Sequence, residues 1–406
     1  MSNGTCIIVG ASHAAAQLAL SLRQGKWQGK ITIIGNDYFL PYHRPPLSKE
    51  YLSGAKSIDD ILIRPPTVYR RAEIRFALGV RAEAIDRAAK KLVLDDDEAI
   101  SYEKLALTVG SEIRRLKVPG AELPGVFYLR EISDVEQIKG FMGKGKNVVI
   151  IGGGYIGLET AAVLSKLEMN VTVLEALPRV LARVTTPEIS AFYTRVHQEE
   201  GVEIVTGADV QEITGSKSVE GVSCADGRSL AADLVIVGIG VVPSTRLAED
   251  AGLEVNNGII VDEYSRTGDH DILASGDCTS HYNPIYERQV RLESVQNAID
   301  QSINAASTIC GKPKPYHALP WFWSDQYDLK LQIAGLSEGF DQVVVRGSMD
   351  SGRKFSAFYL KRGRVLAVDA VNNPQDFMLG KRMILGKKET DAEKLADKQV
   401  PLKELL

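Results

Sequence analysis

One stretch decides the fold: Val148-Val149-Ile150-Ile151-Gly152-Gly153-Gly154-Tyr155-Ile156-Gly157. It places an apolar run of strand length directly before a cluster of glycines. A helix can follow to about Leu167, and a second apolar run, Val171–Leu174, ends at Glu175. Strand, glycine turn, helix and strand in this order are typical of a βαβ unit that binds a dinucleotide.

Each glycine of this stretch has its own physical role. Gly152 makes the tight turn, Gly154 lets the backbone approach a pyrophosphate, and Gly157 lets the helix pack on the strand. The start of the helix supplies free N–H groups and the positive end of its dipole. Glu175 stands where an acid binds a ribose 2′-hydroxyl, and its charge repels a 2′-phosphate. The pattern therefore predicts an NAD(H) site, although arginines follow soon after the acid.

A weaker copy of the pattern opens the chain. Ile7-Ile8-Val9 leads into Gly10, a helical stretch follows, and Ile31–Ile34 forms the next strand. Gly10 holds the first glycine place, whereas Ser12 and Ala15 hold the second and third. Small residues at these places still permit a tight turn and close packing of the helix on the strand.

Both modules continue in the same way, which indicates an internal duplication of one nucleotide-binding design. Short runs typical of a β-meander follow each module, and an apolar strand then ends in glycine, at Gly110 and at Gly238. From about Pro320, alternating runs such as Phe355–Leu360 predict an antiparallel sheet, and Asp391–Leu406 predicts a polar tail with a short helix. The expected fold class is α/β, with two Rossmann-like dinucleotide-binding domains and a C-terminal α+β domain.

Length and charge exclude several classes of function. The 406 residues suggest two or three domains, and a formal net charge of −4 argues against a nucleic-acid partner. The longest apolar runs, such as Leu234–Val242, have strand length and contain glycine, so no membrane segment is expected. Because the chain enters its first strand without a signal-like segment, we expect it to be cytoplasmic.

The cysteines are far apart in the sequence. Cys6, Cys224, Cys278 and Cys310 form no C-x-x-C or similar pair, so neither a metal site nor a vicinal dithiol is predicted. We expect single thiols that pack as small apolar side chains.

Several motifs together resemble a known family. The chain is similar, nearly from end to end, to the NAD(H)-dependent ferredoxin reductases of cytochrome P450 and ring-hydroxylating oxygenase systems, which are putidaredoxin-reductase-like enzymes of the glutathione-reductase fold. The motifs that carry the resemblance are Pro45-Pro46-Leu47-Ser48-Lys49, Gly152–Glu159, Gly238–Pro243, Gly276-Asp277-Cys278, Arg291–Ala298 and Pro320–Tyr327.

The resemblance implies a domain organisation and a set of cofactor-binding residues. It places an FAD-binding domain at 1–112 and 246–319, an NAD-binding domain at 113–245, and a C-terminal domain that covers the flavin at 320–406. The implied FAD residues are Gly10, Ser12, Ala14, Ala15, Asn36, Asp37, Arg44, Lys49, Ala82, Arg130, Asp277, Val295 and Trp321. The implied NAD residues are Gly152, Gly154, Tyr155, Ile156, Gly157, Glu175 and Gly240.

These roles are implied residue by residue. The resemblance puts Ala14 and Ala15 at the FAD pyrophosphate, Ala82 at the adenine, Asp277 at the ribityl chain and Val295 at the flavin ring, with Arg130 supporting the cofactor. One departure from the family is plain. Many relatives have an acid after the second strand of the FAD module, where this chain has Asn36, with Asp37 next; an asparagine can still bind a ribose hydroxyl.

The implied catalytic residues are Lys49 and Glu159, which resemble the family's ion pair near flavin N5. Without the resemblance, Lys49 is equally a surface lysine, and Glu159 is an acid that favours the positive end of its helix. Trp321 and Trp323 are candidates for an electron exit beside the flavin or, equally, for core aromatic residues.

The resemblance implies an NADH:ferredoxin reductase that takes a hydride from NADH onto FAD. Since no cysteine pair is present, electrons would pass directly and singly to a [2Fe–2S] ferredoxin that feeds a P450 or ring-hydroxylating oxygenase. Scattered basic residues could dock an acidic ferredoxin or be ordinary solvated charges: Arg64, Arg70, Arg71, Lys314 and Lys330. An NADH oxidase or quinone reductase, and a non-enzymatic NAD sensor, are the alternatives. We expect a monomer or a weak homodimer.

Overall fold

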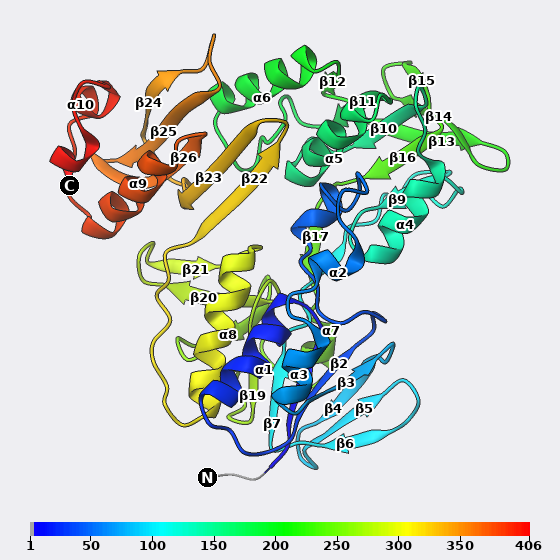
Figure 1. Ribbon diagram of the computed structural model, residues 1–406, viewed down its shortest axis with the longest axis vertical. Helices are drawn as coiled ribbons and strands as arrows, with labels where there is room; N and C mark the ends of the chain where they lie inside the picture. The colour runs from blue at the N-terminus through cyan, green and yellow to red at the C-terminus, as the bar shows by residue number, and fades with distance from the viewer. Residues whose placement is uncertain (1–3) are drawn as a thin grey trace. The chain divides into compact units, whose positions relative to one another are not determined.

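The computed structural model describes residues 4–406, which form two compact units (Figure 1). The first unit contains the described residues up to His43, together with Ile58–Glu112 and Val242–Phe322. The second unit contains Arg44–Ser57, Ile113–Val241 and Trp323–Leu406. Among residues 4–406, no helix combines the length and apolar character needed to cross a membrane.

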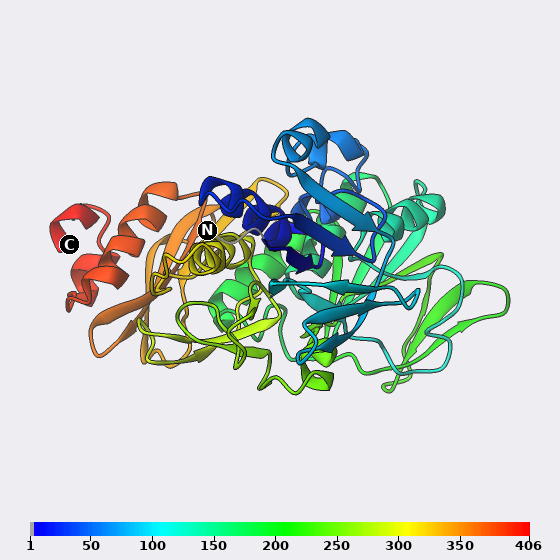
Figure 2. The ribbon, with the colours of Figure 1, turned by 90° about the horizontal axis from the view of Figure 1, so that it is seen from below.

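The first unit is built on a parallel five-stranded sheet of order β19-β7-β1-β2-β3. Its strands are β1 (Cys6–Val9), β2 (Ile31–Gly35), β3 (Ile74–Leu78), β7 (Lys104–Leu107) and β19 (Ile272–Ala274). Successive residues of β1 point to opposite faces, and both faces are buried: Ile8 joins one apolar cluster and Ile7 another. Helices α1 (His13–Gln24) and α8 (Val295–Ile309) lie side by side on the face that includes Ile8 (Figure 2).

Smaller elements complete the first unit. An antiparallel meander of order β4-β5-β6 precedes β7, and a second small sheet has the order β18-β20-β21. Their bounds, with those of the short helices, are β4 (Ala82–Asp86), β5 (Lys91–Leu94), β6 (Ala99–Ser101), β18 (Ile259–Val261), β20 (Thr279–Asn283), β21 (Arg288–Val290), α2 (Ile58–Ile61), α3 (Pro66–Arg71) and α7 (Arg246–Asp250).

The second unit repeats this plan in a parallel sheet of order β12-β11-β10-β16-β9. Its strands are β9 (Val126–Tyr128), β10 (Asn147–Ile151), β11 (Asn170–Glu175), β12 (Glu203–Thr206) and β16 (Leu234–Val237). The accompanying elements are η1 (Pro45–Ser48), α4 (Ile132–Phe141), α5 (Tyr155–Lys166), α6 (Pro187–Glu199) and the meander β13 (Val210–Gly215), β14 (Val219–Cys224), β15 (Ser229–Ala231). The chain changes unit within the paired strands β8 (Ser111–Ile113) and β17 (Val241–Pro243), and also after His43, after Ser57 and after Phe322.

The predicted duplication is confirmed by these two strand orders. In each sheet the first strand of the βαβ unit is central, the next two strands extend to one side, and the strand after the meander lies on the other side. The fifth strands differ in origin, because β19 comes after its module in the chain whereas β9 comes before its module. The short strands β6 and β15, which close the meanders, were not predicted.

The C-terminal part of the second unit is the predicted antiparallel sheet, of order β22-β23-β26-β25-β24. Its elements are β22 (Trp321–Gln326), β23 (Leu329–Gly335), β24 (Gln342–Ser348), β25 (Lys354–Lys361), β26 (Arg364–Val371), α9 (Pro374–Gly386), α10 (Ala392–Ala396) and η2 (Leu402–Leu405). A buried carboxylate links this sheet to the NAD module. Asp369 on β26 accepts hydrogen bonds from Tyr359 Oη at 2.5 Å and from Thr185 Oγ1 at 3.3 Å, and burial raises its pKa to about 6.

One buried histidine of the first unit has a predictable effect on stability. His281 on β20 is 2% exposed, and among residues 4–406 neither of its ring nitrogens has a hydrogen-bond partner. Burial lowers the pKa of His281 from 6.5 to about 4. Between these values the unfolded chain binds more protons than the folded chain, so the folded state loses stability as pH falls.

The free energy of unfolding of the wild-type protein falls between pH 7 and pH 4.5. We therefore predict that this fall is smaller in His281→Leu by roughly 2–3 kcal/mol. Chemical denaturation across this range measures it. The matched control is His270→Leu, which makes the same substitution at an exposed histidine rather than at a buried one. Equal slopes for wild type and His281→Leu would contradict the prediction.

Candidate active site

The glycine turn of the second unit is fixed by backbone contacts. Gly152 has φ +116°, and a Cβ added to it would lie 2.4 Å from the carbonyl oxygen of Gly238 on the neighbouring strand. A Cβ on Gly157 would lie 2.1 Å from the carbonyl oxygen of Gly152. Both positions therefore require glycine, as predicted from the spacing.

The space in front of α5 is open. Gly154 is the N-cap of α5, and a Cβ added to it would meet no atom within 4 Å. Gly154 brings no side chain that could cap the first N–H groups of α5, so these donors are available to an anion. Tyr155 and Ile156 follow in the first turn, where Ile156 is 44% exposed. The turn fits the pyrophosphate of a dinucleotide.

Glu175 is held rigidly at the end of β11. Its Oε2 accepts from the Gly153 N–H at 2.7 Å, and its Oε1 accepts from the Leu177 N–H at 2.8 Å. The carboxylate therefore lies beside the glycine turn, as the interpretation of a ribose-binding acid requires.

The two arginines after Glu175 differ. Arg179 is committed elsewhere, since it donates to Ser190 Oγ at 2.6 Å and to the Ala182 carbonyl at 3.0 Å. Arg183 is exposed, and its guanidinium would lie 3.4 Å from a Cβ on Gly240. Gly240, which has φ +104°, lies in the loop after β16. Of the two arginines, Arg183 is therefore the one that reaches this loop.

The turn of the first unit has the same construction. Gly10 has φ +101°, and a Cβ on it would lie 2.3 Å from the Thr108 carbonyl oxygen. Ser12 is the N-cap of α1, and Ala14 and Ala15 are buried in its first turn.

Two further predicted FAD residues approach this turn. A Cβ on Gly276 would lie 3.4 Å from the Ala14 Cβ, which places the half-buried Asp277 next to the start of α1. The same Gly276 donates its N–H to Gln301 Oε1 of α8 at 2.8 Å, and Val295 is the first residue of that helix. The structure thus brings Gly10, Ala14, Asp277 and α8 into one region of the first unit.

The strand register refines the position of Asn36. Val9 pairs with Ile34 in the first unit, and Ile151 pairs with Leu174 in the second. The counterpart of Glu175 is therefore Gly35, and exposed Asn36 lies one residue beyond it. Asp37 is engaged locally, because its Oδ2 accepts from Tyr42 Oη at 2.8 Å.

The remaining predicted FAD residues are divided between the units. Ala82 on β4 and Trp321 belong to the first unit. The backbone N–H of Trp321 donates to Gln296 Oε1 at 3.2 Å. Arg44, Lys49 and Arg130 belong to the second unit, where Arg44 Nη1 donates to the Arg130 carbonyl at 2.6 Å.

Sequence analysis also missed a histidine pair in the first unit. His13 Nε2 and His43 Nδ1 are 3.3 Å apart, and His13 follows directly after Ser12 at the start of α1.

Lys49 and Glu159 form a buried ion pair within the second unit. Lys49 Nζ is 2.5 Å from Glu159 Oε2, and the two side chains are 13% and 5% exposed. Lys49 is therefore not a surface lysine, and the carboxylate of Glu159 is directed at a partner rather than at solvent. Charged groups this deeply buried are retained only with such partners.

Two serines complete the surroundings of Glu159 and were missed from the sequence. Ser48 Oγ donates to Glu159 Oε2 at 2.6 Å, and Ser324 Oγ donates to Glu159 Oε1 at 2.7 Å. Both residues stand in motifs that carried the resemblance, but a serine within a motif gives no sign of which carboxylate it reaches.

The cysteines have the predicted character of packed, unreactive thiols. All four are free, and burial raises the pKa of Cys6 and of Cys278 to about 12. Cys224 and Cys310 also have pKa values raised by burial. Since the thiolate is the reactive form, none of them is suited to relay electrons.

The predicted basic residues are exposed, in two separate parts of the chain. Arg64, Arg70, Arg71 and Lys314 lie in the first unit, and Lys330 lies in the second. Trp323 is half-buried on β22. Among residues 4–406, no group of three or more His, Cys, Asp or Glu side chains could hold a metal ion.

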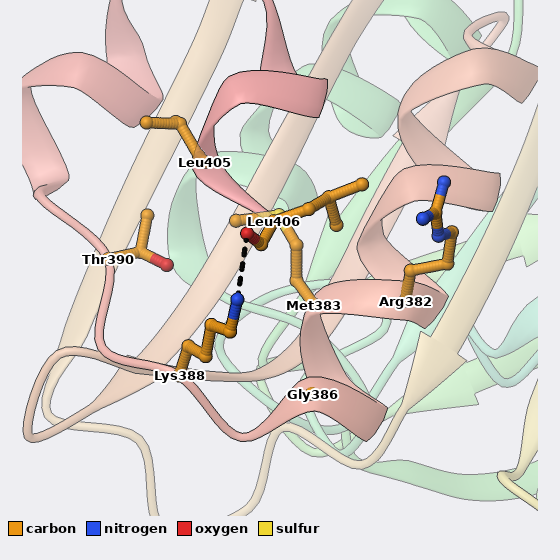
Figure 3. A pocket seen from close by; sticks show the side chains of 7 residues that line it. All are labelled: Arg382, Met383, Gly386, Lys388, Thr390, Leu405 and Leu406. Carbon is orange, nitrogen blue, oxygen red and sulfur yellow. Dashed lines mark hydrogen bonds between the residues drawn. The ribbon is translucent and has the colours of Figure 1, made fainter.

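A small cavity of about 170 Å³ lies near the end of α9 (Figure 3). Its lining residues are far from both glycine turns along the chain. Met383, Thr390 and Leu405 contribute to its lining, and Lys388 Nζ donates to the carbonyl oxygen of Leu406 at 3.1 Å. The contact secures the chain end, and the cavity contains none of the predicted site residues.

The chain matches known families and proteins over nearly its full length. Residues 4–302 match the family described as pyridine nucleotide-disulphide oxidoreductase, and residues 321–406 match the family described as reductase C-terminal. The chain is 42% identical to putidaredoxin reductase CamA of Pseudomonas putida, over 100% of this chain and 97% of that protein. It is 42% identical to rhodocoxin reductase of Rhodococcus erythropolis, over 98% of this chain and 93% of that protein.

Solved structures are equally similar. The crystal structure of the covalent putidaredoxin reductase–putidaredoxin complex matches with a TM-score of 0.96 and 42% identity, over 100% of this chain and 98% of that chain. The ferredoxin reductase for the CYP199A2 system from Rhodopseudomonas palustris matches with a TM-score of 0.95 and 43% identity, over 98% of this chain and 99% of that chain.

Two glycines of the α5 turn allow a contrasting test. Gly154→Ala should weaken NADH binding about tenfold or more while changing the unfolding free energy by less than about 1 kcal/mol, because the added methyl enters only the open space before α5. Gly157→Ala should instead destabilise the fold by roughly 1–3 kcal/mol. NADH titration and chemical denaturation measure the two effects.

Gly140 supplies the control, since a Cβ there also meets no atom within 4 Å but lies on α4. Gly140→Ala should leave NADH binding unchanged. The interpretation of the turn fails if Gly154→Ala binds NADH as tightly as Gly140→Ala does.

Proposed function

Because this chain belongs to the pyridine nucleotide-disulphide oxidoreductase family, we propose that it is an FAD-containing NADH:ferredoxin reductase. It takes a hydride from NADH and passes electrons singly to a [2Fe–2S] ferredoxin, which feeds a cytochrome P450 or a ring-hydroxylating oxygenase. Full-length similarity to putidaredoxin reductase and to other ferredoxin reductases supports this acceptor.

The observation that carries the proposal is the state of the cysteines. A member of a disulphide oxidoreductase family that reduced a disulfide would need a reactive thiol next to its flavin. Here the four thiols are free and separate in the sequence, and burial raises the pKa of each. Electrons therefore leave from the flavin to an external acceptor.

The glycine turn of the first unit would hold FAD and that of the second would hold NADH. Bound FAD supplies the chemistry of accepting a hydride and returning its two electrons separately. In the first unit, Gly10, Ser12, Ala14 and Ala15 serve the pyrophosphate, with Asn36, Asp37, Ala82, Asp277, Val295 and Trp321 as further FAD contacts. Arg44, Lys49 and Arg130 are the remaining residues that we propose for FAD binding.

The NADH contacts come from the second unit. The turn at Gly152 lets the backbone come close to the pyrophosphate, and the start of α5, from Gly154 through Tyr155 and Ile156 to Gly157, supplies the N–H groups. Glu175, fixed by two backbone N–H groups, accepts from the ribose hydroxyls, and Gly240 borders the same site.

Lys49 is the residue that acts at the flavin. Glu159, Ser48 and the Pro45 carbonyl, which accepts from Lys49 Nζ at 3.2 Å, hold the ammonium group in one place. A fixed positive charge favours negative charge that develops nearby during hydride transfer. Glu159 holds the Lys49 ammonium group in position.

We further propose the domain boundaries 1–112 with 246–319 for FAD, 113–245 for NAD and 320–406 for the C-terminal domain, and a cytoplasmic location, where NADH is available. Exposed basic residues are candidates for contact with an acidic ferredoxin: Arg64, Arg70, Arg71 and Lys314 in the first unit, and Lys330 in the second. Opposite charge on the partner would speed encounter rather than add much affinity.

Stopped-flow spectroscopy tests the function directly. NADH should reduce the flavin much faster than NADPH does, and a [2Fe–2S] ferredoxin should then accelerate its reoxidation. Oxygen alone and a quinone alone are the two controls, because an NADH oxidase or a quinone reductase would turn over rapidly with them. If no [2Fe–2S] protein accelerates reoxidation, the proposed function is wrong.

The preference for NADH should depend on Glu175. Glu175→Ala removes charge-assisted hydrogen bonds to the ribose, so the KM for NADH should rise about tenfold. The KM for NADPH should fall, because the repulsion of the 2′-phosphate is gone. Steady-state kinetics with both nucleotides measure the change.

Exposed Glu212 on β13 provides a control with the same loss of charge. Glu212→Ala should leave both KM values unchanged. An unaltered NADH-to-NADPH ratio in Glu175→Ala would remove Glu175 from the specificity site.

A further inference from the structure

A row of buried polar side chains leads away from Glu159 through the second unit. Ser324 Oγ, which contacts Glu159, is 3.1 Å from Gln326 Nε2, and Gln326 Oε1 is 2.9 Å from His197 Nε2. His197 Nδ1 is in turn 3.0 Å from Tyr327 Oη. Ser324, Gln326 and His197 are 1%, 2% and 0% exposed.

The direction of every hydrogen bond in this row follows from chemistry. Gln326 Oε1 can only accept, so His197 Nε2 carries a proton. Burial lowers the pKa of His197 to about 4, so its ring is neutral and Nδ1 accepts from Tyr327 Oη. Gln326 Nε2 can only donate, so Ser324 Oγ accepts this hydrogen bond. The hydroxyl of Ser324 therefore donates to Glu159 Oε1.

All donors in the row therefore point toward the carboxylate. Glu159 Oε1 accepts from Ser324, and Oε2 accepts from Ser48 and Lys49. Reversing the row would require a proton on Glu159 and a turned Gln326 amide, together with the other tautomer of His197. Aligned hydrogen bonds strengthen one another in a buried environment, so the row favours a single orientation of the Glu159 carboxylate.

The arrangement is more specific than core packing requires. Ser324 and Gln326 are alternate residues of β22, which places both on one face of that strand, and His197 comes from α6. An apolar core at these positions would avoid three buried polar side chains that must each be satisfied.

We propose that Ser324, Gln326 and His197 are positioning residues for the Lys49–Glu159 pair, holding the carboxylate of Glu159 aimed at Lys49 through one polarised row of hydrogen bonds. This inference rests on the proposed function, in which Lys49 acts at the flavin. Ser324 touches Glu159 directly, and Gln326 and His197 act through Ser324.

The first test is the rate of flavin reduction by NADH, measured in single-turnover stopped-flow with the FAD-loaded protein and no ferredoxin. Ser324→Ala and Gln326→Leu should each lower the limiting rate about tenfold while leaving the dissociation constant of NADH within about twofold, since each removes support for a charged hydrogen bond and no NADH contact. Ser356→Ala is the matched control, because Ser356 is 0% exposed on β25 but lies outside the row. It should leave both values unchanged.

A double-mutant cycle separates positioning from general stability. In the Glu159→Gln background, where the carboxylate is already gone, Gln326→Leu should have little further effect on the rate. His197→Gln keeps an N–H that can reach Gln326 and should retain most of the rate, whereas His197→Phe should not. Additive losses in the cycle, or equal rates for His197→Gln and His197→Phe, would overturn the inference.

The tautomer of His197 gives a readout that needs no turnover. Nitrogen-15 NMR of the whole protein, with His197→Gln to assign the signal, should show a neutral ring protonated at Nε2 at pH 7; protonation at Nδ1 would overturn the inference. The two proposals also fail differently. A wild-type protein whose flavin NADH does not reduce contradicts the proposed function, whereas normal reduction that is unchanged in Ser324→Ala and Gln326→Leu contradicts only the positioning role.

Discussion

The close approach of one strand to the glycine of a neighbouring turn is the constraint on which both nucleotide-binding modules depend. At Gly10 a Cβ would lie 2.3 Å from a carbonyl oxygen of the next strand, and at Gly152 it would lie 2.4 Å from the equivalent oxygen. Because the turn is this tight, the helix that follows begins directly beside the sheet, and its first N–H groups face the space beyond the strand ends. The positions of Ala14 and Gly154 follow from this geometry, as does that of Glu175 beside Gly153.

The duplication shows how one backbone plan can keep its shape while its side chains change. In the second unit the strand end carries Glu175 and the turn carries Gly153; in the first unit the strand end carries Gly35 and the turn carries Ala11. A Cβ on Gly35 would lie 2.5 Å from the Ala11 Cβ, so only one of the two positions can bear a side chain of this orientation. The first module therefore has no room for an acid at Gly35, the position that corresponds to Glu175. The polar residue Asn36 stands one position later.

Sequence patterns predicted the fold well because its strands are buried on both faces and its turns require glycine. The two βαβ units, the meanders and the antiparallel C-terminal sheet all leave apolar runs or glycine spacings that can be seen locally. The register of Asn36 could not be predicted, because a shift of one residue at a strand end changes no apolar pattern. Likewise, the pairing of Lys49 with Glu159, 110 positions apart in the chain, was implied only by the family resemblance and leaves no trace in periodicity.

The surroundings of Glu159 show why such a site is only partly visible in a sequence. Ser324 and Gln326 alternate with larger or charged residues on β22, which is the pattern of any half-buried strand, and His197 lies in a helix whose other buried residues are mostly apolar. Only the three-dimensional arrangement shows that these polar side chains share one direction of hydrogen bonding. A single buried carboxylate accepts from a lysine and two serines. The cost of burying this carboxylate is thus offset by neighbours from two separate segments, Ser48-Lys49 and Ser324, and the position of Lys49 depends on both.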